Sequence, residues 1–222
     1  CEVPDLRLKD ISLRSKMPLV LLASASERRR QLMSEFLKNR VVDLEFYVLK
    51  APEEEASSKT EVRLQVEKAC IRKAFAAANE IGSEGKNGPD IILVSDTLVE
   101  DPDDEMAALG KPKDKSGAAF GLVRLSGRRH RVWSSTAIID RKIGDFEVGT
   151  GWMATIWTDY SIVEFEEIEE EAMFSLIASQ SWKGKAGGYD LAGDAGKFAK
   201  IIEGEEVTVL GFSNRAIGSL DG

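Results

Sequence analysis

Hydrophobic residues gather in short runs that predict β-strands. Three runs are rich in Val, Leu and Ile, and they lie at 18–24, 44–49 and 91–97. Two longer β segments follow at 128–140 and 146–165, and a turn around Gly144 and Asp145 predicts that they form a hairpin. The sequence therefore predicts three early strands that other elements separate from one another, followed by two later strands that pair in an antiparallel hairpin.

Apolar residues recur at helical spacing between and after these runs. The segments with this spacing are 27–38, 60–81, 114–125, 167–179 and 207–220. Glycine-rich or acidic stretches predict loops at 82–90, 100–113 and 180–196. Because strands and helices alternate early, the sequence predicts an α/β protein with a mixed sheet, in which region 128–165 forms a second lobe.

Composition narrows the class of protein. The chain has 222 residues, 43% of them hydrophobic, which is enough for one domain at 17–222 after an N-terminal extension at 1–16. A net charge of −8 argues against a nucleic-acid binder. No apolar run approaches the roughly 20 residues that span a bilayer, so we expect no membrane partner. The two cysteines, Cys1 and Cys70, fit a cytoplasmic location, and His130 as the single histidine excludes a structural zinc site.

Three arginines stand where a helix does not favour them. The stretch SASERRR at 24–30 puts Arg28, Arg29 and Arg30 in the first turn of a helix, whose unpaired N–H groups already carry partial positive charge. Arg29 also lies above the apolar face of that helix, while Ser26 is a suitable N-cap. A solvated basic turn is the alternative to a binding role.

A lysine interrupts the apolar stripe of the helix at 60–81. That stripe consists of Leu64, Ile71, Phe75 and Ala78. Lys68 falls in its middle, whereas Lys73 falls on the opposite face, where lysine is ordinary. Lys68 is either a ligand-binding residue or a side chain that extends its ammonium group past the stripe into solvent.

A carboxylate follows a predicted buried strand. The run at 91–94 continues into Ser95, Asp96 and Thr97. Ligands of α/β sheets gather beyond the carboxyl ends of strands, so Asp96 is a candidate for chemistry, although an aspartate that starts a turn is the alternative.

A bound polyanion would account for all of these charges. It would meet the N-terminus of the first helix, the forks of Arg28 and Arg29, and the point charges of Lys68 and Lys111. Asp96 would then hold a divalent metal or activate a water, which is an arrangement for phosphoryl chemistry. The P-loop pattern GxxxxGK[ST] is absent from the sequence.

Seven short motifs occur in an order typical of one enzyme family. They are LLASASERRRQLM (21–33), VEKA (66–69), SDTLV (95–99), LGKP (109–112), LSGRRHRV (125–132), KAGGYDLAG (185–193) and EGEEVTVLGF (203–212). In these motifs the chain resembles the Maf-type nucleoside triphosphate pyrophosphatases. The resemblance implies an elongated mixed β-sheet with flanking helices and two lobes around a central cleft, similar to inosine triphosphate pyrophosphatases. It also implies a homodimer and cleavage of a nucleoside triphosphate to a monophosphate and pyrophosphate with Mg, Mn or Co.

The resemblance also implies roles for individual residues. Phosphate binders would be Arg28, Arg29, Lys68 and Lys111, next to a phosphate loop lined by Ser24 and Ser26. Asp96 would be the proton acceptor for the attacking water or a metal ligand. Lys68 would assist catalysis, and one glutamate of 53–55, for which we choose Glu54, would assist the metal. Lys185 is a further binding candidate because the glycines after it let the backbone approach a ligand.

Substrate preference divides the family into branches. The branch that resembles dTTP/UTP pyrophosphatases has the arginine found here as Arg28 and the threonine found here as Thr97. Ala192 departs from it, since a glutamine is expected there and alanine cannot hydrogen-bond a base. We expect hydrolysis of dTTP, UTP or modified pyrimidine nucleotides in house-cleaning. The alternatives are a nucleotide-binding regulator of cell division with little turnover, and an enzyme acting on another phosphate anhydride.

Overall fold

One mixed sheet organises the protein. The computed structural model describes residues 17–50, 60–81, 88–149 and 151–220. Within these residues eight strands form one sheet, in the order β2-β1-β3-β5-β7-β6, with β4 paired to β3 and β8 paired to β7. The strands are β1 (Leu19–Ala23), β2 (Asp43–Tyr47), β3 (Ile91–Asp101), β4 (Asp104–Leu109), β5 (Arg129–Asp140), β6 (Phe146–Gly149), β7 (Trp152–Phe165) and β8 (Ala199–Glu203). β1 is parallel to β2 and β3, and the other pairs are antiparallel.

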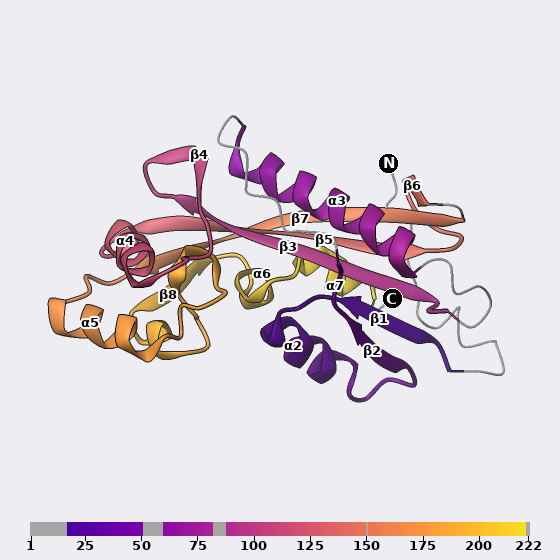
Figure 1. Cartoon of the computed structure of the whole chain (residues 1–222), viewed down its shortest axis with the longest axis horizontal. Helices are drawn as coiled ribbons and strands as arrows, with labels where there is room; N and C mark the ends of the chain where they lie inside the picture. The colour runs from indigo at the N-terminus through magenta and orange to yellow at the C-terminus, as the bar shows by residue number, and fades with distance from the viewer. Residues whose placement is uncertain (1–16, 51–59, 82–87, 150, 221–222) are drawn as a thin grey trace.

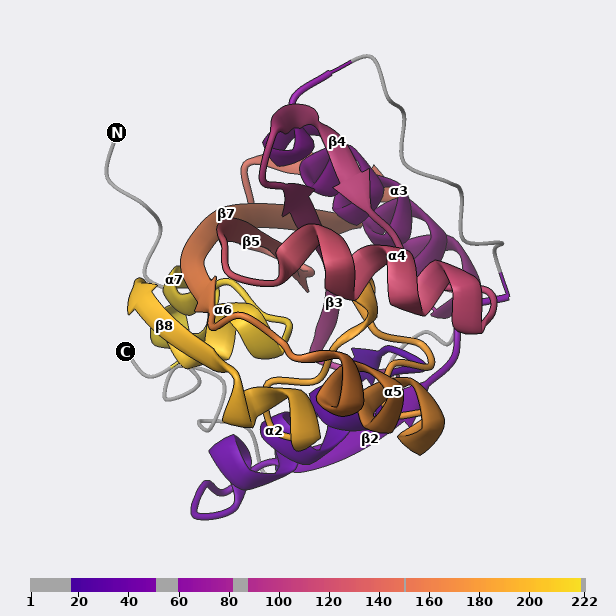
Figure 2. The ribbon, with the colours of Figure 1, turned by 90° about the vertical axis from the view of Figure 1, so that its left-hand side faces the viewer.

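Helices cover both faces of this sheet. They are α2 (Glu27–Leu37), α3 (Val62–Ile81), α4 (Lys115–Leu125), α5 (Glu170–Ser179), α6 (Glu206–Leu210) and α7 (Asn214–Ser219), with short 3₁₀ turns η2 (Ala186–Gly188) and η3 (Asp194–Lys197). The long strands β3, β5 and β7 run along the long axis, with α3 on one side and α2, α6 and α7 on the other (Figure 1). The helices α4 and α5 lie at one end, beside β4 and β8 (Figure 2). None of the helices in the described residues is both long and apolar enough to cross a membrane.

Alternation along β3 supplies a core to each face. Ile92 and Val94 pack in the cluster under α3, while Ile91 and Leu93 pack with α2 and α7 on the other face. A third cluster lies under α4 and α5, where Val99 of β3 takes part. Because successive side chains of a strand point to opposite faces, the chemistry of β3 is also divided between the two faces.

The structure confirms the predicted mixed α/β sheet and corrects several elements. The predicted loop at 100–113 contains β4, and β8 was not predicted at all. The predicted segment 146–165 is two strands, and β5 pairs with β7 from Arg129 to Asp140, whereas β6 pairs only with β7. The predicted helix 207–220 is broken into α6 and α7 at Gly211, whose φ is 126°.

Of the predicted stripe of α3, only Ala78 belongs to the buried face. Phe75 is 43% exposed, while the side chains against the sheet are the small or branched ones Val66, Cys70, Ala74 and Ala77. Small residues let the helix approach the strands closely, and Phe75 instead packs at the side against Phe146. The prediction followed the largest apolar residues and so rotated the helix.

Candidate active site

The turn from β1 into α2 exposes the N-terminus of α2. Ser26 caps the helix, since its side chain accepts a hydrogen bond from the Arg29 N–H at 3.4 Å. Ser24 is buried, and its Oγ accepts from the Ser26 N–H at 3.2 Å. The predicted cap is thereby confirmed, and the two serines lie where the free N–H groups of the helix point outward.

Arg29 is enclosed by protein oxygens. Its Nε donates to the Gly211 carbonyl at 2.9 Å, its Nη1 to the Ser95 carbonyl at 3.0 Å, and its Nη2 to Thr97 Oγ1 at 2.8 Å. Thr97 Oγ1 also shares a hydrogen bond of 2.8 Å with Ser134 Oγ. Arg29 therefore joins α2 to β3 on both sides of Asp96.

Arg28 faces a carboxylate that the sequence did not single out. Its Nε donates to the Leu210 carbonyl at 3.0 Å, and its Nη1 lies 3.1 Å from Asp190 Oδ1. Lys185 Nζ lies 3.1 Å from Asp190 Oδ2. Burial opposes ionisation of Asp190, but the hydrogen bonds and charges of Lys185 and Arg28 outweigh it, so the pKa of Asp190 lies below its usual value. Two predicted binding residues, Arg28 and Lys185, are thus brought together by Asp190.

Asp96 lies in the middle of β3 rather than at a carboxyl end. β1 pairs with β3 only as far as Leu93, and β4 pairs with β3 only from Val99 onward. Between these positions no strand of the described residues pairs with this edge of β3. The prediction was wrong about the end of the strand, yet Asp96 still lies beyond the carboxyl end of β1, because β1 stops first and β3 continues.

Lys73, not Lys68, is the lysine at Asp96. Lys73 Nζ forms an ion pair with Asp96 Oδ1, and both side chains are about four-fifths buried. Lys68 is exposed on the outer surface of α3. The rotated face of α3 explains the error, since it turns Lys73 toward β3 and Lys68 toward solvent. Asp96 Oδ2 accepts no hydrogen bond from the described residues.

The remaining predicted residues divide between the site and the surface. Lys111 is exposed on the loop after β4, where the Gly110 carbonyl accepts from the Gly187 N–H of η2 at 3.2 Å. Ala192 is exposed, and its N–H donates to Asp190 Oδ1 at 3.2 Å. Glu54 and the neighbouring glutamates lie outside the described residues.

The group available to bind a metal at this site is the carboxylate of Asp96. No cluster of three or more His, Cys, Asp or Glu side chains able to hold a metal occurs in the described part of the chain. Mg²⁺ is commonly held by one or two carboxylates together with substrate phosphates and water. Asp96, with an oxygen left uncommitted by the described residues, fits that pattern as a single protein ligand.

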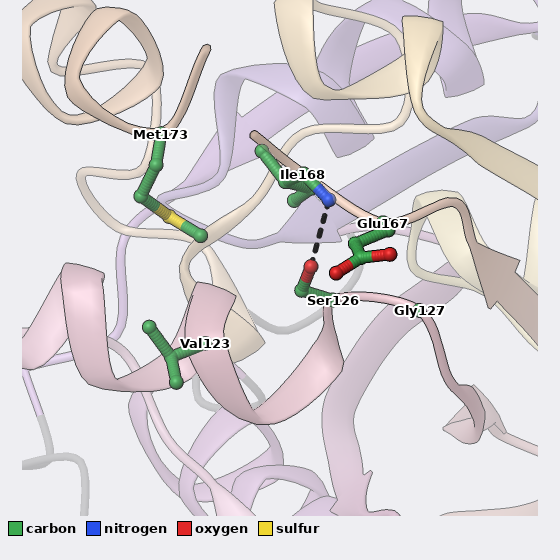
Figure 3. Close-up of a pocket in the computed structure, with 6 residues that line it drawn as sticks. All are labelled: Val123, Ser126, Gly127, Glu167, Ile168 and Met173. Atoms are coloured by element: carbon green, nitrogen blue, oxygen red, sulfur yellow. Dashed lines mark hydrogen bonds between the residues drawn. The ribbon is translucent and has the colours of Figure 1, made fainter. Parts of the chain in front are cut away.

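Of two cavities in the described residues, one lies at this site and the other lies away from it. A small cavity is lined by Arg28, Thr97 and Tyr189, among others, and so belongs to this site. A larger one, of about 490 Å³, lies between α4 and α5, where Val123 and Met173 face each other and Ser126 accepts from the Ile168 N–H at 2.7 Å (Figure 3). The larger cavity contains none of the charged groups described above.

Comparison with known proteins shows the family. A family described as Maf-like protein matches residues 19–220. The chain belongs to the Maf-like family. It is 31% identical over 202 residues to a dTTP/UTP pyrophosphatase of Thermococcus gammatolerans, with 91% of this chain and 95% of the relative covered.

Two further comparisons reach less far. The chain is 32% identical over 194 residues to a human protein named probable bifunctional dTTP/UTP pyrophosphatase/methyltransferase, and that match covers 87% of this chain but 30% of the human protein. A HAM1 protein of Coxiella burnetii matches with a TM-score of 0.44 at 17% identity, covering 67% of this chain and 73% of that one.

Proposed function

We propose that this Maf-like protein hydrolyses nucleoside triphosphates to a monophosphate and pyrophosphate. The observation that carries the proposal is the set of Arg28, Lys73 and Asp96 around the uncovered edge of β3, next to the N-terminus of α2. Relatives named dTTP/UTP pyrophosphatase support the same reaction.

The cations of the site suit a triphosphate. The α2 N-terminus offers N–H groups and a favourable dipole to an anion, and Arg28 Nη2 donates to none of the described residues. Lys185, about one-quarter exposed, pairs with Asp190 of its own loop, on the side opposite Arg28 of α2. Asp190 lies between the two cations, so a phosphate would be held beside it by the donors that Asp190 leaves unused, Arg28 Nη2 and the remaining N–H groups of Lys185 Nζ.

The reaction is a hydrolysis at the α-phosphorus. Water adds there, the bond from that phosphorus to the bridging oxygen breaks, and pyrophosphate leaves with the electron pair. Asp96 Oδ2 accepts the proton of the attacking water, while Lys73 holds the other carboxylate oxygen. In the alternative role, in which Asp96 Oδ2 is a metal ligand, a divalent cation held by Asp96 and the phosphate oxygens would neutralise charge on the departing pyrophosphate.

The base preference follows the pyrimidine branch. Arg28 and Thr97 match the residues expected for dTTP/UTP pyrophosphatases, and the relatives carry that name. Ala192 provides no side-chain amide for the base. We therefore propose dTTP, UTP and modified pyrimidine triphosphates as substrates, with selectivity over purines weaker than a glutamine would give.

A nucleotide panel tests this proposal. dTTP, UTP, CTP, GTP and ITP are each supplied with Mg²⁺, Mn²⁺ or Co²⁺ or with a chelator, and pyrophosphate and orthophosphate are counted separately. We expect pyrophosphate alone, fastest from dTTP and UTP, and none with the chelator. Orthophosphate as the product would indicate another anhydride reaction. Nucleotide binding without any product would indicate the regulator.

A further inference from the structure

The two neighbouring arginines of α2 are held in different ways. Arg28 uses Nε and Nη1 and keeps Nη2 for a ligand, as far as the described residues show. Arg29 has each of its three nitrogens directed at a protein oxygen, on β3 and on the turn between α6 and α7. A guanidinium has five N–H donors in a rigid fork, and in this geometry all three nitrogens of Arg29 donate to the protein itself.

Gly211 provides the space that Arg29 needs. A Cβ at Gly211 would lie 2.7 Å from Arg29 Nε and 3.2 Å from its Cγ. The Gly211 carbonyl accepts from Arg29 Nε at 2.9 Å and also from Ser95 Oγ at 2.7 Å. Since Arg29 Nη1 donates to the Ser95 carbonyl, Arg29, Gly211 and Ser95 form a closed ring of hydrogen bonds.

This ring fixes the stretch of β3 that no strand covers. Arg29 bonds Ser95 and Thr97, the residues before and after Asp96, at the edge left open between β1 and β4. A strand edge without a partner has unpaired backbone groups and is held less firmly than a paired one. Arg29 satisfies one backbone group here, the Ser95 carbonyl, and holds Thr97 through its side-chain hydroxyl.

We infer that Arg29 is a positioning residue and not a phosphate ligand. Its hydrogen bonds to Ser95, Thr97 and Gly211, which we call the clamp, set the direction of Asp96, and Gly211 leaves the space that the Arg29 side chain occupies. The phosphate contact at this helix start belongs to Arg28. The inference rests on the proposed hydrolysis for its kinetic readout, but the clamp itself is a property of the folded chain.

Two substitutions displace the clamp without adding or removing charge. Arg29→Lys loses the fork, and Gly211→Ala puts a methyl group against Arg29. For both we expect kcat to fall about tenfold or more with KM within about threefold, because the water-activating group moves while the phosphate contacts stay. The kcat of the double variant should lie within about twofold of the kcat of the less active single variant. Arg28→Lys, in contrast, should mainly raise KM.

Gly151→Ala is the control for backbone strain. Gly151 has a φ of 73°, and a Cβ there would have no atom of the described residues within 4 Å, so alanine strains the backbone without touching the site. This control should retain wild-type kcat and KM. If Gly211→Ala does not fold, Thr97→Val, which removes the acceptor of Arg29 Nη2, takes its place.

Opposite kinetics would overturn the inference. A KM for Arg29→Lys raised about tenfold with kcat preserved would make Arg29 a phosphate ligand. If the losses of kcat in the two single variants add up in the double variant, Arg29 and Gly211 act independently and the inference is wrong. If the wild type shows no turnover, the proposed function fails separately. The clamp is then judged by non-additive urea unfolding of the same variants, and by tripolyphosphate affinity, which should be unchanged in Arg29→Lys and weakened in Arg28→Ala.

Discussion

At the scale of single residues, the charge balance at Asp96 depends on Lys73. The two side chains are 17% and 22% exposed, so each is largely removed from water and has its partner's charge in compensation. Taking away one member of such a pair leaves the other uncompensated in a partly buried position. Lys68, five residues earlier on the same helix, carries the same charge in solvent and provides a matched comparison.

Lys73→Met should lower the rate of pyrophosphate release about 100-fold, because a fixed positive charge next to the reacting groups is lost. Lys68→Met should leave the rate within about threefold of wild type. Steady-state assays on the two variants, with thermal melts to verify folding, make the comparison. A larger loss in Lys68→Met than in Lys73→Met would return the catalytic role to Lys68.

His130 links the sheet to the loop that carries Asp190. Its Nε2 lies 2.9 Å from the Tyr189 hydroxyl, while its buried Nδ1 has no hydrogen-bond partner in the described residues. Burial lowers the pKa of His130 from 6.5 to about 3. The unfolded chain therefore takes up a proton near pH 6.5 that the folded protein does not, and stability present above that pH is lost as the pH falls.

His130→Phe should remove this pH dependence. Below pH 6.5 the histidine lowers the free energy of unfolding of the wild type by up to about 1.4 kcal/mol per pH unit, and phenylalanine cannot titrate. Urea unfolding of both proteins from pH 7.5 to 5 gives the two slopes. Parallel curves would show that the imidazole is protonated in the folded state.

At the scale of elements, the glycine-rich loop around η2 is held against β3 by close contact. Gly187 has a φ of 68°, and a Cβ there would lie 2.9 Å from Val99 Cγ2. Gly184, in the same loop, has a φ of 70° and nothing within 4 Å of a Cβ. The two positions have the same backbone conformation and differ in packing.

Gly187→Ala should therefore lower the free energy of unfolding by about 2 kcal/mol more than Gly184→Ala, which is the cost of overpacking alone. It should also raise KM, because the displaced loop carries Lys185 and Asp190. Urea unfolding and kinetics of the pair measure both effects. Equal destabilisation by the two alanines would contradict the contact with Val99.

Local signals predicted some elements well. β1 and α2 follow from an apolar run, a serine cap and helical spacing, all of which act within a few residues. β4 and β8 were not predicted, because they are short, partly exposed strands without a clear apolar pattern, and each forms by pairing with a strand distant from it or longer than it, β3 for β4 and β7 for β8. The face of α3 escaped because close packing selected small residues over large ones.

The same division applies to the site. Arg28 and Asp96 were identified from charges in unusual places, and Lys185 was identified from the glycines that follow it. Lys73 and Asp190 were not, because their importance comes from neighbours distant in sequence: 23 residues separate Lys73 from Asp96, and 162 separate Arg28 from Asp190. An aspartate between two glycine-rich stretches gave a weak hint, but only the fold pairs it with Arg28.

At the scale of the whole molecule, the site joins both ends of the chain. The start of α2, the middle of β3, the η2 loop and the α6–α7 turn meet through Arg28 and Arg29. The protein is acidic overall, with a net charge of −8, so attraction for a triphosphate has to be local. Homodimer formation stays a prediction from the family resemblance.

The most direct measurement compares wild type with Asp96→Asn on dTTP. Pyrophosphate release and nucleotide binding are measured on the same preparations, the second with a non-hydrolysable triphosphate. We expect pyrophosphate from the wild type, a loss of about 1,000-fold or more in the rate of the variant, and nucleotide affinity within about threefold, because asparagine keeps the shape of the side chain but cannot accept the proton of water. An Asp96→Asn protein that still releases pyrophosphate near the wild-type rate would contradict this expectation.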